Sequence, residues 1–78
     1  MPVRFRGNTA YLRGTCTVED GEPLLAWCLE REAPRVNLKE CRHLHTAVLQ
    51  VLLVAEARLA TPPEDAQLRE IIAPLLRS

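Results

Sequence analysis

Alternating apolar and polar residues predict that the chain begins with extended structure. The stretches "VRFR" at 3–6 and "TAYLR" at 9–13 both alternate, as half-buried strands do. Between them stand Gly7 and Asn8, a pair typical of a two-residue hairpin turn. The pattern therefore predicts a β-hairpin at the start of the chain.

The spacing of apolar residues then changes to that of a helix. We expect Asp20 to cap this helix, with Pro23 in its opening turn, where a missing amide is tolerated. Leu24, Leu25, Cys28 and Leu29 fall on one helical face. Pro34 ends the segment, and "RVNL" at 35–38 follows as a short strand.

Two further helices are expected in the second half of the chain. Residues 44–57 are almost continuously apolar, which predicts the most buried helix of the protein. After a short strand at 58–60, Thr61 stands three residues before Glu64, as in a capping box, with Pro62 at the first helical position.

The order of elements is strand, strand, helix, strand, helix, strand, helix. Strands that alternate with helices favour an α/β fold, here a small mixed β-sheet of about four strands with helices packed on it. At 78 residues and 8.8 kDa, the chain is expected to form a single domain over residues 1–78.

Charge and hydropathy narrow the classes of partner. Ten Lys and Arg balance ten Asp and Glu, and no long block of like charge occurs, so a nucleic-acid partner is not expected. The uncharged run at 44–55 is too short to span a bilayer, and "MPVRFRGN" lacks an apolar signal core. We therefore expect a soluble cytoplasmic protein without a membrane partner.

The three cysteines contain no C-x-x-C pair and are expected to be reduced and packed as small apolar residues. Cys41, His43 and His45 stand at alternate positions, which raises the alternatives of a metal site or a redox site. A metal site usually needs a fourth donor, and no other histidine exists. The common nucleotide and hydrolase signatures are absent, so neither an enzyme nor a cofactor is expected.

The segment "RVNLKECRHLHTAVLQVLLVAEA" resembles the central motif of STAS domains, the fold of bacterial anti-anti-sigma factors. In that family a D-L-S strand leads through a loop to D-S-S-G-L and an apolar helix. Here Val36 to Leu38 match the strand, residues 39–44 the loop, and 45–49 the D-S-S-G-L step. The stretch "AYLRGTCTVEDGEPLLAWCLE" is similar to the family's strand ending at Gly followed by a capped helix.

The differences from the motif bear on function. His45 replaces the acid, Ala47 the second serine and Val48 the glycine, whereas Thr46 keeps the hydroxyl at the phosphoacceptor position. Only one helix follows residues 58–60, so the chain is expected to be a short member that lacks the family's final strand and helix.

The resemblance implies a non-enzymatic signalling domain that docks onto a protein, such as an anti-sigma-type kinase, under the control of phosphorylation at Thr46. The expected partner-binding residues are Arg42, His43, His45 and Gln50. A hydroxyl at a helix start is also typical of an N-cap, so Thr46 has that second interpretation. Two other functions stay open: a self-associating assembly module and a small metal- or redox-responsive protein that uses Cys41, His43 and His45.

Overall fold

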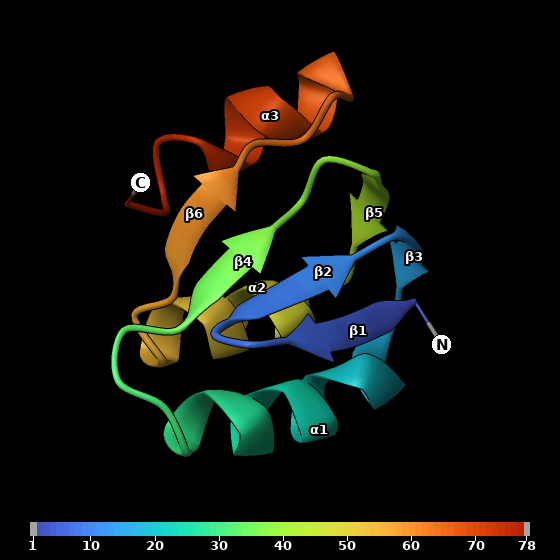
Figure 1. The fold of residues 1–78 in the computed structure, drawn as a ribbon. Coiled ribbons are helices and arrows are strands. Elements are labelled where there is room, and N and C mark those ends of the chain that lie inside the picture. Colours follow the sequence, from blue (N-terminus) through green and yellow to red (C-terminus); the bar gives the residue numbers. More distant parts are fainter. Residues whose placement is uncertain (1, 78) are drawn as a thin grey trace.

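The hairpin predicted at the start of the chain forms one edge of a four-stranded sheet (Figure 1). The computed structural model describes residues 2–77. Over this range the elements are β1 (Val3–Arg6), β2 (Thr9–Leu12), β3 (Gly14–Cys16), α1 (Val18–Leu29), β4 (Arg35–Asn37), β5 (Cys41–Leu44), α2 (Thr46–Val54), β6 (Arg58–Thr61) and α3 (Ala66–Ile72).

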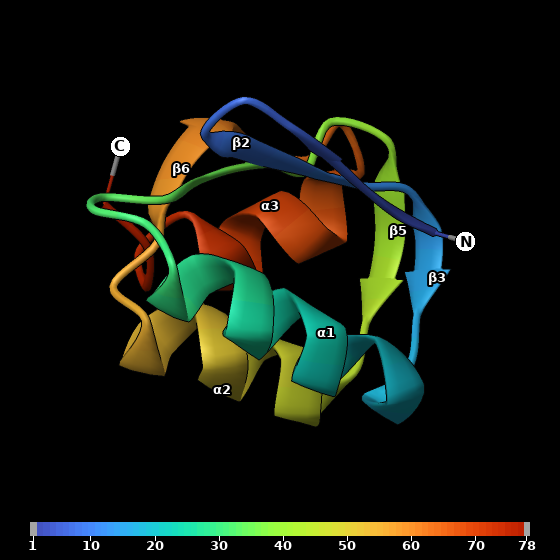
Figure 2. The same cartoon turned by 60° about the horizontal axis from the view of Figure 1, so that its bottom comes forward.

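The four-stranded sheet has the order β1-β2-β4-β6, with β1 antiparallel to β2 and the other neighbours parallel. Each parallel step needs a crossover, and α1 and α2 supply the two crossovers. Figure 2 shows both helices on one side of the sheet, where they pack against each other. The predicted mixed α/β fold is confirmed.

Two strands were not predicted from the pattern. β3 and β5 pair in parallel as a separate two-stranded ribbon, which turns away from the four-stranded sheet (Figure 2). The bend between β2 and β3 lies at Gly14, whose φ is 61°, and its N–H donates to the carbonyl oxygen of Glu40 at 2.8 Å. The expected loop at 39–44 is therefore partly a strand, too short to show periodicity.

The first helix begins earlier than the sequence pattern indicates. Thr17 is its N-cap, and Asp20 lies in the first turn, where its Oδ2 accepts a hydrogen bond from the Thr17 N–H at 2.7 Å. Pro23 consequently lies inside the helix, not in its opening turn. The prediction that Asp20 is the cap was wrong because Asp20 satisfies the cap residue's amide from within the helix.

The second helix is shorter and less buried than predicted. It covers only Thr46–Val54, and of its apolar residues only Val48 and Leu52 are buried. Leu53 and Val54 are 38% and 71% exposed. The most buried helix is α1, which buries Asp20, Gly21, Leu24, Trp27 and Cys28.

The third helix starts after Asp65, whose Oδ1 accepts a hydrogen bond from the N–H of Leu68 at 3.0 Å. Thr61, the predicted cap, is instead the last residue of β6, where its Oγ1 accepts a hydrogen bond from the Asn37 side chain at 3.2 Å. The helix ends at Ile72, before Pro74, as the sequence predicts. None of the helices in the described part of the chain has both the length and the apolar character needed to span a bilayer.

The core is mostly aliphatic, with an aromatic cluster where the C-terminal end of α1 meets the β1–β2 hairpin. Trp27 is 8% exposed and stacks on Phe5, with ring centroids 4.9 Å apart. The guanidinium of Arg31 lies 4.4 Å from the Trp27 ring centre, and its Nε donates to the carbonyl oxygen of Gly7. This cluster fastens the hairpin turn to the end of α1.

Candidate functional site

The five residues expected at the functional surface are all exposed, and four of them lie at the step from β5 to α2. Arg42 and His43 belong to β5, whereas His45 and Thr46 stand at the start of the helix. Gln50 follows Thr46 by one helical turn, which puts both on the same helix face. We refer to these five residues as the α2 corner.

His45, not Thr46, caps the second helix. Its Nδ1 accepts a hydrogen bond from the backbone N–H of Ala47 at 2.9 Å. An imidazole nitrogen accepts only when it carries no proton, so this contact fits the neutral tautomer with hydrogen on Nε2. The His45 carbonyl accepts from Val48 and Leu49, which completes the first turn.

The cap assignment changes the interpretation of Thr46. Thr46 is the first helical residue, is exposed, and its hydroxyl makes no hydrogen bond with any group in residues 2–77. The alternative interpretation that Thr46 serves as the N-cap was therefore wrong. Its hydroxyl is left available for contact or modification.

The start of α1 lies beside the start of α2, which sequence reasoning missed. The β3–β5 pairing matches Thr15 with His43 and Cys16 with Leu44, and the His45 N–H donates to the Cys16 carbonyl oxygen at 3.0 Å. Both strands then pass directly into helices. Exposed residues of β3 and α1, above all Thr15, Thr17 and the 58% exposed Val18, therefore extend the α2 corner.

This extension could have been predicted from the sequence only if β3 had been recognised as a strand. The stretch "GTCT" alternates in type, and Cys16 is buried while Thr15 and Thr17 are exposed. A strand of three residues is too short for this alternation to stand out from chance.

The structure does not bring Cys41 together with the two histidines. Cys41 has no exposed surface, and its thiol points to the core and donates weakly to the His43 carbonyl oxygen at 3.5 Å. His43 and His45 are exposed. Within residues 2–77 no three His, Cys, Asp or Glu side chains gather closely enough to hold a metal ion.

The thiols are also in a poor environment for nucleophilic chemistry. A hydrogen bond with Cys41 and then burial raise the pKa of Cys16, and burial raises the pKa of Cys28, whereas the hydrogen bond with Cys16 lowers the pKa of Cys41. Cys16, Cys28 and Cys41 are all free and buried. Because none of the three is accessible, burial is what makes their surroundings unsuitable, and inaccessible thiols are typical of packing residues.

The chain was also compared with known proteins. No protein family, curated protein or solved structure matches it.

Proposed function

We propose that the protein is a non-enzymatic regulatory domain, similar to the STAS proteins of bacterial partner switching, that acts in the cytoplasm. In this proposal the α2 corner docks onto a protein partner such as an anti-sigma-type kinase. The observation that carries it is the exposed Thr46 hydroxyl, which is released from capping because His45 takes that role.

Phosphorylation of Thr46 would act on docking through charge. A phosphate carries nearly two negative charges near neutral pH, and the positive end of the helix dipole at a helix start favours such an anion. The modified helix therefore stays folded. The exposed apolar side chain of Val18 belongs to the neighbouring helix start, and charge placed beside it would weaken binding to an apolar or acidic partner surface.

The test compares partner capture by the wild-type protein and by Thr46→Glu in lysate of the native host. We expect Thr46→Glu to lose a partner that wild type and Thr46→Val retain, because valine keeps the shape without the charge. Gln67→Glu, which adds a negative charge on exposed α3, is the matched control and should retain the partner.

Mass spectrometry of the protein recovered from the host tests the modification itself. A phosphate on Thr46, absent from Thr46→Val, supports the switch. Equal capture by wild type and Thr46→Glu, together with unmodified Thr46 in every growth condition, would contradict it.

A second candidate function is self-association, favoured by apolar side chains exposed near the ends of the helices. Leu29 and Val54 are both 71% exposed, and Leu53 and Leu75 line a groove of about 570 Å³ between the end of α2 and the C-terminal segment. Such exposed apolar surface is typical of protein interfaces.

Light scattering across a range of protein concentrations separates the two candidates. An assembly module should form a dimer that Val54→Ser disrupts, whereas a monomer at all concentrations would exclude this function. Thr46→Glu should leave the oligomeric state unchanged in either case.

A further inference from the structure

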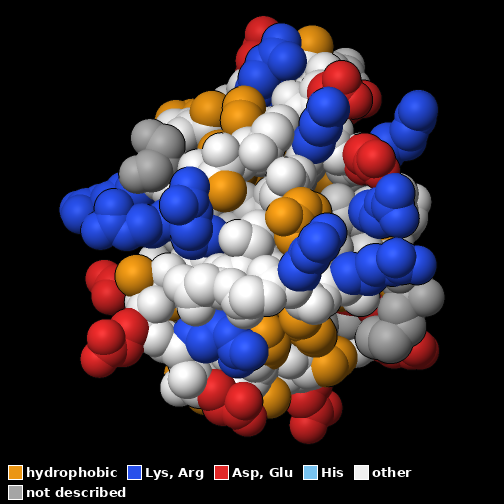
Figure 3. Space-filling view, viewed as in Figure 1, with side chains coloured by type: hydrophobic (Ala, Val, Ile, Leu, Met, Phe, Trp, Pro, Cys, Tyr) orange, Lys and Arg blue, Asp and Glu red, His pale blue; other side chains and the backbone are white. Residues whose placement is uncertain are grey.

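The face of the four-stranded sheet that the helices leave uncovered is rich in arginine. The opposite face of the sheet packs on the core. It contains Ala10, Val36 and Leu59, which are register partners across β2, β4 and β6 and are all buried. Side chains alternate along a strand, so the residues on either side of these three point to the outer face. Figure 3 shows Lys and Arg side chains across this view and Asp and Glu mostly around its margin.

Three arginines of the outer face stand in one row. Arg6 is paired with Thr9, Thr9 with Arg35, and Arg35 with Arg58, so the row crosses all four strands. With neighbouring strands about 4.8 Å apart, it extends over about 14 Å. Like charges directly opposite each other destabilise a sheet.

Among the described residues, no acidic side chain forms an ion pair with this row. Among residues 2–77 the ion pairs are Arg13 with Glu40 and Arg31 with Glu30, and none includes Arg4, Arg6, Arg35 or Arg58. A balanced net charge predicts no polyanion partner, but the balance is global and this face is locally positive.

The next row supplies different chemistry. In the strand register, Arg4 is paired with Tyr11, and Tyr11 with Asn37. The Asn37 side chain is held in place by two hydrogen bonds: its Nδ2 donates to Thr61 Oγ1 at 3.2 Å, and its Oδ1 accepts from the Lys39 N–H at 2.9 Å. Tyr11 is half-buried and lines a hollow of about 500 Å³ with Arg4, Arg6, Arg13 and Lys39. Glu40 is the single carboxylate among the described residues of this hollow, and Arg13 already binds it.

We propose that this open face binds single-stranded nucleic acid, with the arginine row on phosphates and the Tyr11 ring stacked on a base. Cations that follow a backbone beside an aromatic ring are the usual means of holding a single strand without sequence preference. An acidic protein segment would use the cations but has no use for the ring. The arginine row and Tyr11 share no residue with the α2 corner.

The experiment measures fluorescence anisotropy of labelled single-stranded RNA and DNA of about 12 nucleotides, a length within typical site sizes. We expect binding that weakens as salt rises. Arg35→Gln with Arg58→Gln should flatten the slope of log affinity against log salt by about 0.7 for each cation removed. Tyr11→Leu should weaken binding about tenfold and leave that slope unchanged.

Arg69→Gln is the matched control, because it removes an exposed cation from α3, outside the sheet face, and should leave affinity unchanged. The double variant Arg35→Lys with Arg58→Lys keeps the charge and should keep the slope. It therefore shows whether these two positions tolerate substitution, so that a change in the glutamine variant can be assigned to charge. Absence of binding at low salt would overturn the proposal. Two results together would overturn it in favour of an acidic protein partner. In that case Tyr11→Leu would bind the oligonucleotide as tightly as wild type, and polyglutamate would displace the labelled oligonucleotide as well as unlabelled oligonucleotide does.

Discussion

The imidazole Nδ1 of His45 accepts a hydrogen bond from the N–H of Ala47 at 2.9 Å and so caps α2. His45→Ala leaves that amide without its partner and should lower the free energy of unfolding by about 1 kcal/mol. His45→Asn should keep most of the stability, because asparagine is a good N-cap. Urea denaturation measures both variants.

His43→Ala is the control, since His43 is an exposed β5 residue outside the cap. It should change the unfolding free energy by less than about 0.5 kcal/mol. An equal loss in His43→Ala and His45→Ala would contradict the capping role.

Two glycines should respond in opposite directions to substitution by alanine. Gly14 has φ 61° in the bend between β2 and β3, and a side chain there is strained although space is open. Gly14→Ala should therefore destabilise the protein by about 1–2 kcal/mol. Gly21 lies inside α1, where a Cβ would meet Val51 Cγ2 at 3.7 Å, an ordinary contact.

Gly21→Ala should accordingly stabilise the protein by about 0.5–1 kcal/mol, because alanine favours the helix and restricts the unfolded chain. Thermal and urea denaturation of both variants give the comparison. A destabilised Gly21→Ala would mean that α1 and α2 pack more tightly than the structure indicates.

The sequence predicts elements that are long or have a turn signal, and it misses those defined by distant partners. Gly7 and Asn8 mark the hairpin directly. β3 and β5 have three and four residues and exist because they pair with each other across the 24 intervening residues, 17–40. Local periodicity contains no information about such pairing.

The same limit applies to the candidate site. The sequence predicts the exposed start of α2 and its hydroxyl, but not that His45 takes the cap from Thr46. Histidine is an uncommon N-cap, and its assignment here depends on a ring orientation that only the structure supplies. The outer sheet face was missed because Arg6, Arg35 and Arg58 are far apart in the chain, and only the strand register puts them in one row.

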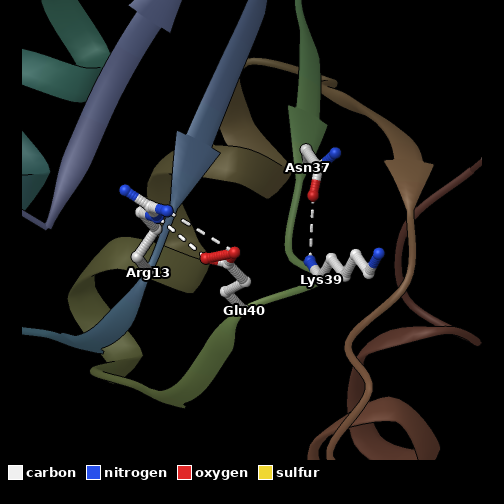
Figure 4. A network of polar contacts seen from close by, with 4 residues as sticks. All are labelled: Arg13, Asn37, Lys39 and Glu40. Carbon is white, nitrogen blue, oxygen red and sulfur yellow. Dashed lines mark hydrogen bonds and ion pairs between the residues drawn. The ribbon is translucent and has the colours of Figure 1, made fainter.

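The ion pair between Arg13 and Glu40 predicts a pH dependence. Arg13 Nε donates to Glu40 Oε2 at 2.9 Å at the rim of the sheet (Figure 4). This hydrogen bond, and then the positive charge of Arg13, lower the pKa of Glu40. The contribution to stability is therefore present above the unfolded carboxyl pKa of about 4.3 and is lost as pH falls through the lower folded pKa.

Thermal unfolding of wild type and Glu40→Gln between neutral and acidic pH measures this contribution. The difference in melting temperature should be small at neutral pH, because both partners are about half exposed, and should vanish in acid. High salt should reduce it as well. A difference that grows as pH falls would contradict the assignment.

Buried thiols should make the native protein slow to react with Ellman's reagent. The hydrogen bond with Cys41 and then burial raise the pKa of Cys16, and burial raises the pKa of Cys28, whereas the hydrogen bond with Cys16 lowers the pKa of Cys41. Because all three thiols are buried, the reagent reaches each of them only after the protein opens. In concentrated denaturant all three thiols should react at once. At lower urea concentrations the rate of thiol reaction should increase with urea as steeply as global unfolding does. Rapid reaction of one native thiol, removed by Cys41→Ala and unaffected by Cys28→Ala, would show that Cys41 is accessible and would restore the redox alternative.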